Sequence, residues 1–459
     1  MMGSGGLLHN LLFFIIAIGV LVAFHEFGHY WVARLLKVKV LRFSIGFGKP
    51  LYVRKVQKGE DLIEFAVAAI PLGGYVKMLD EREGPVDESI RHRAFNTQPL
   101  ASRFAIVAAG PVFNFILAIF LYFIFFVNGE DGIKPMIAEP AAQSAAAIAG
   151  FEAGDEIVAV AGQPVRTWNE FRMALIEHGL DGGDIVLDVR SSDLYQTQRL
   201  ISIGDRHILN EKSDVVELLG FDVWRPDFPA VIGGVSEAAP AERAGLKAGD
   251  RILSIDQQPV SDWQQVVDVI QSSANKTLQL TISRQGDTHE VSLQPESRER
   301  GDQLVGFMGA YPEVSQQLLD QSRVRIEYGV FEAMQRATVE TWTFSVLTLK
   351  VLGKMLVGQA ALENISGPIT IAQYAGITAS IGFLIYIKFL AMISVSLGVL
   401  NLLPVPMLDG GHLMYYLVEL IKGSPVSQRV EQLGQQIGIT LLFLLMSLAI
   451  FNDIQRLLN

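Results

Sequence analysis

The chain has 459 residues, half of them hydrophobic, and a net charge of −11 at pH 7. This length allows several domains, and the negative charge without a folded basic patch argues against a nucleic-acid partner. The chain contains no cysteine, so cysteine usage says nothing about its redox compartment.

Four apolar stretches are long enough, or nearly so, to cross a bilayer as helices, which takes about 20 residues. They cover residues 7–27, 104–127, 381–403 and 434–452, and the last is the shortest. The first stretch has neither the basic leader nor the small-residue cleavage site of a signal peptide. We therefore expect a multi-pass α-helical membrane protein with four transmembrane helices.

The first stretch contains ionisable residues, because positions 25–29 read His-Glu-Phe-Gly-His. On a helix this spacing places His25 and His29 one turn apart on one face, with Glu26 beside them. Ionisable groups at membrane depth are costly and usually mark a site. Together these features predict a zinc hydrolase whose metal lies within the bilayer.

Basic residues follow the first stretch, with eight lysines and arginines between positions 34 and 58. Basic residues close to a span stay in the cytoplasm, so we expect both termini and residues 128–380 on the opposite side. Residues 40–78 have a strand-like pattern. We expect a membrane-associated β-hairpin or small sheet there, with glycines that allow close backbone approach.

The segment between the second and third stretches contains a duplication. Residues 150–168 and 245–263 match at a constant offset of 95 positions (245 − 150), each with a Gly-Asp turn, a short apolar strand, a Pro-containing turn and a helix that opens near a tryptophan. The copies end in Leu-Leu-Gly-Phe at 218–221 and Leu-Val-Gly-Phe at 304–307. These features resemble PDZ domains in the permuted order of bacterial proteases.

The resemblance implies two tandem α+β PDZ domains, over residues 128–222 and 223–315. Backbone N–H groups around the final glycine could hold a peptide carboxylate while a strand edge pairs with the peptide. Peptide C-termini are therefore expected partners. The alternative is that these glycines only form turns.

The residues that follow the modules are helical in pattern. Lys350 and Lys354, one turn apart, interrupt an apolar series within residues 324–360. This pattern fits an interfacial amphipathic helix, and it fits a surface helix packed on the second module equally well. We expect an extracytoplasmic helical segment over residues 316–378.

The third stretch leads into a motif with a second set of ionisable residues. It runs from Asn401 through Leu-Leu-Pro-Val-Pro-Met-Leu to Asp409, followed by Gly-Gly and His412. An aspartate at membrane depth is costly unless it is paired or binds a metal, and two prolines break the helix locally. A catalytic zinc needs a third protein ligand, and both Asp409 and His412 qualify.

The pairing of HEFGH with NxxPxPxLDG resembles the site-2 protease family of intramembrane zinc metalloproteases, and the resemblance covers essentially the whole chain. It implies that His25, His29 and Asp409 ligate Zn²⁺, that Glu26 is the catalytic base and that Asn401 contacts the substrate. The implied reaction is hydrolysis of peptide bonds within or near transmembrane segments of single-pass proteins. Anti-sigma factors and remnant signal peptides are the implied substrates.

The same resemblance implies a bacterial inner-membrane location, with both termini and the PDZ pair in the periplasm, where the pair is a size-selective gate. The remaining expected segments are the first transmembrane helix (1–36), a cytoplasmic-side β region (37–99), the second transmembrane helix (100–127), the third with the LDG motif (379–412), and a loop with the fourth (413–459).

Two other classes of protein are alternatives to a protease. A membrane-anchored PDZ scaffold with a silent metal site would not need Glu26. A metal transporter would usually repeat its spans, whereas only the soluble modules are duplicated here.

Overall fold

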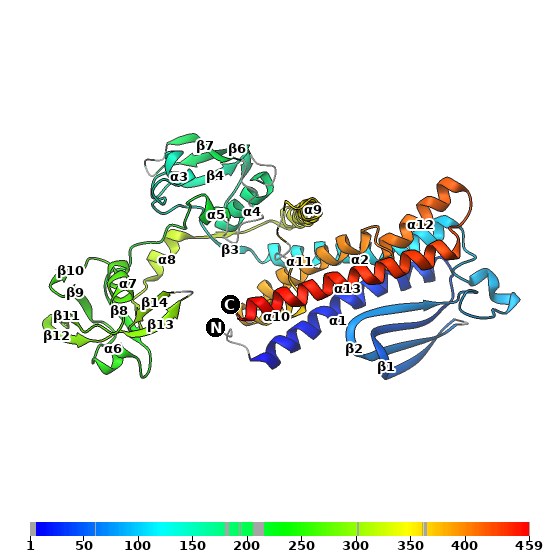
Figure 1. The fold of residues 1–459 in the computed structure, drawn as a ribbon, viewed down its shortest axis with the longest axis horizontal. Helices are drawn as coiled ribbons and strands as arrows, with labels where there is room; N and C mark the ends of the chain where they lie inside the picture. Colours follow the sequence, from blue (N-terminus) through cyan, green and yellow to red (C-terminus); the bar gives the residue numbers. More distant parts are fainter. Residues whose placement is uncertain are drawn as a thin grey trace. The chain divides into compact units, whose positions relative to one another are not determined.

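The computed structural model describes residues 6–59, 61–179, 183–191, 193, 195–204, 215–300, 303–359, 361 and 365–458. These residues form two compact units. The first contains the described residues before Asp131 and after Arg325, and the second contains those from Asp131 to Arg325 (Figure 1). Each unit has its own apolar core.

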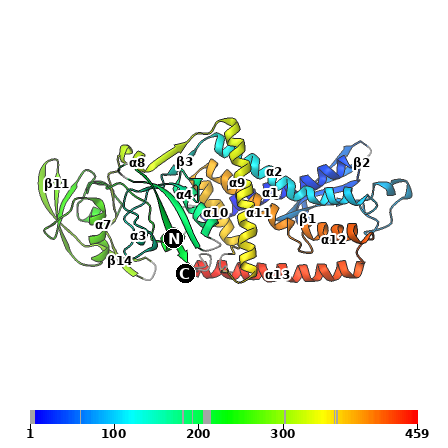
Figure 2. The same cartoon turned by 90° about the horizontal axis from the view of Figure 1, so that it is seen from above.

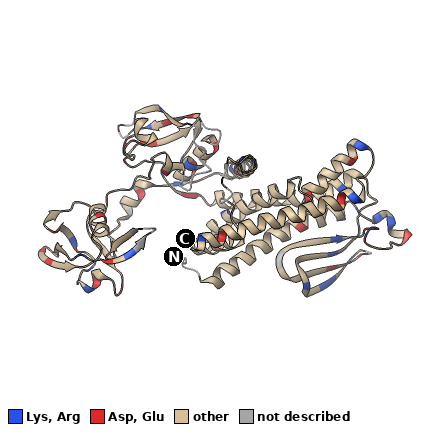
Figure 3. Ribbon diagram, in the orientation of Figure 1, with Lys and Arg blue, Asp and Glu red and all other residues tan. Residues whose placement is uncertain are grey.

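Four helices of the first unit are long and apolar enough to cross a membrane, counting only described residues. They are α1 (Leu7–Leu35), α2 (Leu100–Val127), α11 (Phe383–Leu402) and α13 (Gln428–Leu458). Charged residues are sparse along them (Figure 3). Long apolar runs become helices in a membrane because a helix satisfies its own backbone hydrogen bonds. The four predicted stretches are confirmed as helices, and α1, α2 and α13 extend beyond them.

The packing of α2 positions the rest of this unit. This helix packs against α1, α11, α12 (Asp409–Lys422) and α9 (Val330–Leu356). Small residues let α1 come close to it, because a Cβ added to Gly28 would lie 2.4 Å from the carbonyl oxygen of Ala109. The histidine-bearing part of α1 is thereby held directly against α2.

The helix α9 crosses the other helices steeply, as the views in Figures 1 and 2 show. It packs against α2 and α11, and it leaves Phe331, Trp342 and Leu356 exposed. This helix belongs to the first unit and not to the unit that contains the two modules.

A buried aspartate joins the last long helix to α10 (Pro368–Ile381), which packs against α1, α11 and α13. Asp453 on α13 accepts hydrogen bonds from the backbone N–H groups of Gly367 and Ile369, at 2.9 and 2.8 Å. These N–H groups lie at the start of α10, where a helix cannot satisfy them itself. Asp453 therefore holds the beginning of α10 against α13.

The predicted strand region consists of β1 (Val40–Lys58) and β2 (Asp61–Met78). The two strands fold into a layer with more than one pairing between them. Residues 42–45 lie between residues 64–67 and 74–77 of β2. The second of these β2 segments pairs on one side only among the described residues, so it is an edge of the layer.

Two glycines allow β1 to turn within this layer. Gly46 and Gly48 have φ of +91° and +84°, which favour glycine. A Cβ at Gly46 would also lie 2.8 Å from the carbonyl oxygen of Ile70. The layer is packed on the ends of α1 and α2 by a cluster of buried apolar residues. These are Tyr30, Ala33, Val38, Val40, Phe43, Ile63 and Ile106.

The second unit contains two modules with the same order of elements. Their sheets have the orders β5-β4-β6-β7 and β10-β9-β11-β12. The first module has β4 (Glu156–Val160), β5 (Gln163–Pro164), α4 (Trp168–Gly179), β6 (Gly183–Arg190) and β7 (Gln196–Gly204). The second has β9 (Arg251–Ile255), β10 (Gln258–Pro259), α7 (Trp263–Ser272), β11 (Leu278–Arg284) and β12 (Asp287–Leu293). Both helices open at the predicted tryptophan.

Shorter elements complete the chain. They are η1 (Glu88–Arg93), β3 (Glu130–Ile133), α3 (Ala145–Ile148), α5 (Val215–Leu218), β8 (Ile232–Val235), α6 (Pro240–Arg243), β13 (Glu296–Arg300), β14 (Gln303–Phe307), β15 (Ala310–Pro312), α8 (Gln316–Ser322) and β16 (Arg323–Ile326). The strands β3 and β16 pair with each other.

The Gly-Asp turn of each module is held by a buried aspartate that pairs with an arginine. Asp155 pairs with Arg199 of β7, whereas Asp250 pairs with Arg284 of β11. Each arginine also donates to a glycine carbonyl of the same turn. The equivalent aspartates of the two modules therefore pair with arginines from different strands.

Candidate metal centre

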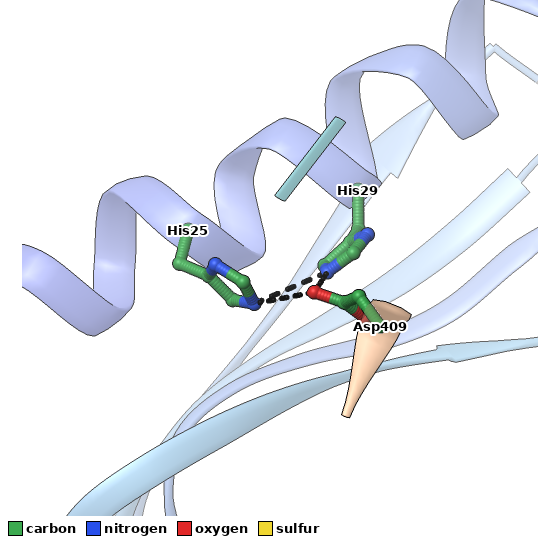
Figure 4. A group of neighbouring side chains, drawn as sticks. All are labelled: His25, His29 and Asp409. Atoms are coloured by element: carbon green, nitrogen blue, oxygen red, sulfur yellow. Dashed lines mark hydrogen bonds and ion pairs between the residues drawn. The ribbon is translucent and has the colours of Figure 1, made fainter. Parts of the chain in front are cut away.

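Three side chains from α1 and α12 converge in the first unit. The Nε2 atoms of His25 and His29 lie 3.3 Å apart, and Oδ2 of Asp409 lies 3.2 and 3.5 Å from them (Figure 4). Within the described ranges, no other group of three His, Cys, Asp or Glu residues brings its donor atoms this close, within 4.8 Å of one another. These are the three ligands that the family resemblance implied.

The chain between α11 and α12 explains how Asp409 reaches the histidines. The expected third helix over 379–412 is interrupted, because α11 ends at Leu402 and α12 begins at Asp409 itself. Two prolines between them prevent a continuous helix. The expected loop after residue 412 is likewise replaced by the rest of α12. The LDG motif therefore opens a new helix, and its aspartate occupies the first turn.

The glycines that follow Asp409 let α12 start against the preceding loop. A Cβ at Gly410 would lie 2.2 Å from the carbonyl oxygen of Leu403, and one at Gly411 would lie 2.5 Å from that of Val405. Larger residues would push the first turn of α12 away. The Gly-Gly pair thus sets how closely the start of α12, with Asp409, packs on the preceding loop.

The donor set fits a catalytic zinc. Such a site combines three protein ligands of the nitrogen and oxygen type with one open position. Apart from the two histidine nitrogens, the buried Oδ2 of Asp409 has no hydrogen-bond donor among the described residues. Gly110 of α2 makes room beside the imidazoles, because a Cβ there would lie 2.3 Å from Nε2 of His29.

The outer nitrogens of both imidazoles face α2. Nδ1 of His29 lies 2.8 Å from the carbonyl oxygen of Ile106, and Nδ1 of His25 lies 3.1 Å from Nδ2 of Asn114. Sequence analysis did not identify Asn114. The available signal was a single amide side chain inside an otherwise apolar span, at a depth where polar groups usually have a partner.

The side chain of Glu26 lies between α1 and the β layer. Glu26 is 8% exposed, and a Cβ at Gly74 of β2 would lie 2.9 Å from its Cγ and 2.7 Å from the carbonyl oxygen of Ser44. Gly74 therefore leaves the space that Glu26 occupies. Sequence analysis missed this glycine, because nothing in the local pattern of β2 links it to α1.

The two other candidate residues lie outside the group of three. Asn401 is half-buried in the last turn of α11. His412 lies one turn after Asp409, with its ring against that of Tyr415. His412, His29 and Asp409 all line a cavity of about 550 Å³. The structure thus places Asp409, and not His412, beside both histidines.

The same cavity reaches the edge of the β layer. Residues 75–78 of β2 line it together with charged residues of the following loop, Asp80, Arg82 and Glu83. The space next to the candidate ligands is thus bordered on one side by a strand and on another by a polar loop.

Comparison with known proteins gives full-length matches. A model of peptidase family M50 matches residues 13–445. The regulator of sigma-E protease RseP of Escherichia coli (strain K12) is 45% identical over 98% of this chain and 99% of its own length. A putative zinc metalloprotease of Vibrio cholerae serotype O1 is 43% identical over the same shares.

Among solved structures, the PDZ domain of the SdrC-like protein from Listeria innocua matches 19% of this chain and 97% of its own length. The sequence identity is 22% and the TM-score 0.17.

Proposed function

Because this chain belongs to peptidase family M50 and is a zinc metalloprotease of the site-2 type, we propose that His25, His29 and Asp409 hold its zinc and that Glu26 is its catalytic base. The observation that carries the proposal is the convergence of three donor atoms from two apolar segments far apart in the sequence. Family membership decides against the scaffold and the transporter.

The residues around the zinc have separate tasks. A zinc ion held by these residues would lower the pKa of a bound water molecule to about 7 and would polarise the scissile carbonyl. Glu26 accepts the proton of the attacking water and passes it to the leaving nitrogen. Its burial against Gly74 supports this role, because the space between α1 and the β layer limits where the carboxylate can lie. Asn401, half-buried at the end of α11, contacts the substrate near the scissile bond.

Glu26→Gln tests the base. Loss of a general base typically costs 10²- to 10⁴-fold in rate, so we expect the variant to lose cleavage of a single-pass model substrate while its zinc content stays that of the wild type. The measurement pairs product formation in detergent with elemental analysis of the purified chain. His25→Ala is the matched control that loses zinc. Undiminished cleavage by Glu26→Gln would remove Glu26 from this role.

The β layer supplies a place for the substrate. A helical substrate hides its peptide bonds in hydrogen bonds to the i−4 carbonyl, so it unwinds before cleavage. An unwound segment can add to a strand edge. The β2 segment at 74–77 is such an edge, and its residues 75–77 line the cavity that His29 and Asp409 also line. Its association with the membrane is part of the proposal.

The protein lies in the bacterial inner membrane, with its termini and both modules in the periplasm. The eight basic residues between positions 34 and 58 support this orientation, because basic residues near a span remain cytoplasmic. The exposed apolar side chains of α9 support an interfacial position for that helix.

The two modules are tandem PDZ domains that restrict access by size. Their equal order of elements supports a common fold. Substrates whose outer domain has been trimmed enter, and bulky ones do not. Single-pass anti-sigma factors and remnant signal peptides fit this selection, and newly formed peptide C-termini are candidate ligands of the PDZ grooves.

A further inference from the structure

One amide side chain lies in the apolar run of α2, that of Asn114, and it is completely buried. Its Nδ2 lies 3.1 Å from Nδ1 of His25. The backbone carbonyl of Asn114 accepts a hydrogen bond of 2.7 Å from Oγ of Ser394 on α11. Asn114 is thus fixed between the helices that lead to the two halves of the metal centre.

The two imidazoles are held in different ways. A backbone carbonyl oxygen only accepts hydrogen bonds, so His29 must donate from Nδ1–H to Ile106, at 2.8 Å. Its Nε2 then carries the lone pair that faces the metal position. His25 instead faces an amide, which can donate through nitrogen or accept through oxygen.

The zinc-bound state decides between these two orientations of the amide. When Nε2 of His25 is a metal donor, the proton of the neutral ring is on Nδ1 and needs an acceptor. Oxygen and nitrogen of an amide have nearly the same shape, and the hydrogen-bond network decides their positions. A half-turn of the Asn114 amide brings Oδ1, which is buried and has no hydrogen-bond partner, to face Nδ1.

We propose that Asn114 is a positioning residue of the metal centre, whose Oδ1 accepts the hydrogen bond from Nδ1–H of His25 and holds Nε2 of that ring as a zinc donor. This inference rests on the ligand set of the proposed function. No water competes for the hydrogen bond, because the side chain is fully buried. Without the amide, Nδ1–H would be buried and unpaired, which is costly.

The face of α2 that carries Asn114 serves the whole centre. Ile106, Gly110 and Asn114 are spaced by four residues, so they lie on one face of the helix. Ile106 binds one ring, Asn114 binds the other, and Gly110 leaves room for both, since a Cβ there would lie 2.3 Å from His29 and 2.8 Å from His25. The helix α2 contributes no metal ligand itself, but it orients both histidine ligands of α1.

Asn114→Leu and Asn114→Asp in the purified full-length chain test the proposal. Leucine has a similar volume but no acceptor, and we expect its zinc affinity to fall 10- to 100-fold, the usual effect of losing such a partner. Aspartate keeps an acceptor oxygen and should retain near wild-type affinity. Zinc affinity is measured by competition with a chelator, and Co²⁺ absorption in the same variants reports the number of ligands.

Leu121→Ala controls for loosening of α2, because Leu121 is also buried on this helix. It should lower the unfolding temperature and leave zinc affinity unchanged. Equal zinc affinities of Asn114→Leu and the wild type would overturn the proposal. If the leucine variant does not fold, ¹⁵N spectra of histidine-labelled, zinc-loaded wild type decide, because a His25 Nδ1 without a proton contradicts it.

Two ligand variants separate this inference from the proposed function. His25→Ala and Asp409→Ala should both lose zinc. If they keep it, the ligand set itself is wrong. If they lose it while Asn114→Leu binds zinc like the wild type, the ligand set stands and only the role of Asn114 is rejected.

Discussion

Glycines beside the metal centre determine where its larger side chains lie. Gly110 faces the two imidazoles, and Gly74 faces Glu26. The HExxH spacing predicted His25, Glu26 and His29 on one region of a helix, and the prolines predicted a helix break before Asp409. The choice of Asp409 over His412 as third ligand came from the family resemblance. The sequence did not predict the roles of Gly74 and Gly110, because nothing in the sequence around a glycine indicates which distant side chain will pack against it.

Gly74→Ala should reduce catalysis without removing zinc. The added Cβ would lie 2.7 Å from the carbonyl oxygen of Ser44 and 2.9 Å from Cγ of Glu26, so the strand and the carboxylate must move apart. A displacement of about 1 Å can cost around 10²-fold in rate, and we expect a decrease of this order in kcat. The histidines are not displaced, so zinc content should not change.

Gly84→Ala is the matched control for this change, because a Cβ at Gly84 would meet nothing within 4 Å. It should cleave like the wild type. A Gly74→Ala enzyme with normal kcat would mean that the position of Glu26 does not depend on β2.

At the level of elements, the sequence predicted strands over residues 40–78 but not how they fold. The start of β1 pairs with two separate parts of β2, whereas its end pairs with the adjacent start of β2, and the register depends on turns within the strands. The alternating pattern contains no information on these turns. The structure also adds to the role expected for the glycines of this region, because the positive φ of Gly46 and Gly48 serves the bend of β1 and not only close backbone approach.

Valine at Gly46 or Gly48 should reduce proteolysis and leave zinc content intact. A β-branched residue is strained at a φ of +91° or +84°, so the bend opens and the edge at 74–77 moves relative to the cavity. The rate of cleavage and the zinc content are measured together. Leu51→Val, at an exposed position of the same strand, is the control, and equal rates for all variants would reject this role of the bend.

The second module should lose stability at acid pH through one ion pair. Burial alone would raise the pKa of Asp250, but the hydrogen bonds from Arg284 and from the backbone N–H of Lys247 outweigh it and hold this pKa below its usual value of 3.8. A carboxyl group with a lower pKa in the folded state contributes stability above its unfolded pKa. That contribution is lost as the pH falls through the folded pKa.

Arg284→Met should therefore raise the pH at which the module opens. Hydrogen exchange of the β9 and β11 amides in the full chain, corrected for the intrinsic rate at each pH, measures this shift. Arg199→Met is the matched control, because it breaks the corresponding pair of the first module and should leave β9 and β11 protected. An unchanged pH profile in Arg284→Met would show that the pair does not stabilise the turn.

For the molecule as a whole, hydropathy predicted the spans because a bilayer forces every backbone group into an internal hydrogen bond. The break between α11 and α12 was predicted from its prolines, but the helical continuation to Lys422 was not. The duplication was visible because whole modules repeat at a constant offset. The different arginine partners of Asp155 and Asp250 were not visible, because that difference lies in three-dimensional contacts.

The size gate is tested by removing the modules without disturbing the first unit. A deletion from residue 128 would remove Glu130, which pairs with Lys388 of α11 at 2.9 Å and is buried. Loss of one member of a buried pair typically costs about 3–5 kcal/mol. A better deletion keeps Lys134 and Ser322 and removes the residues between them, because these two already lie side by side: the N–H of Lys134 donates to the carbonyl of Ser322 at 2.8 Å.

A two-residue turn such as Asn-Gly can join these positions, since β3 and β16 already pair and such turns suit hairpins. The shortened chain should cleave a trimmed substrate at the wild-type rate and should also cleave the untrimmed form, which the full chain refuses. Both rates are measured on the same substrate pair, with Glu26→Gln in the shortened chain as the inactive control. If the untrimmed substrate is still refused while the trimmed one is cleaved, selection by size belongs to the first unit and the modules have another role.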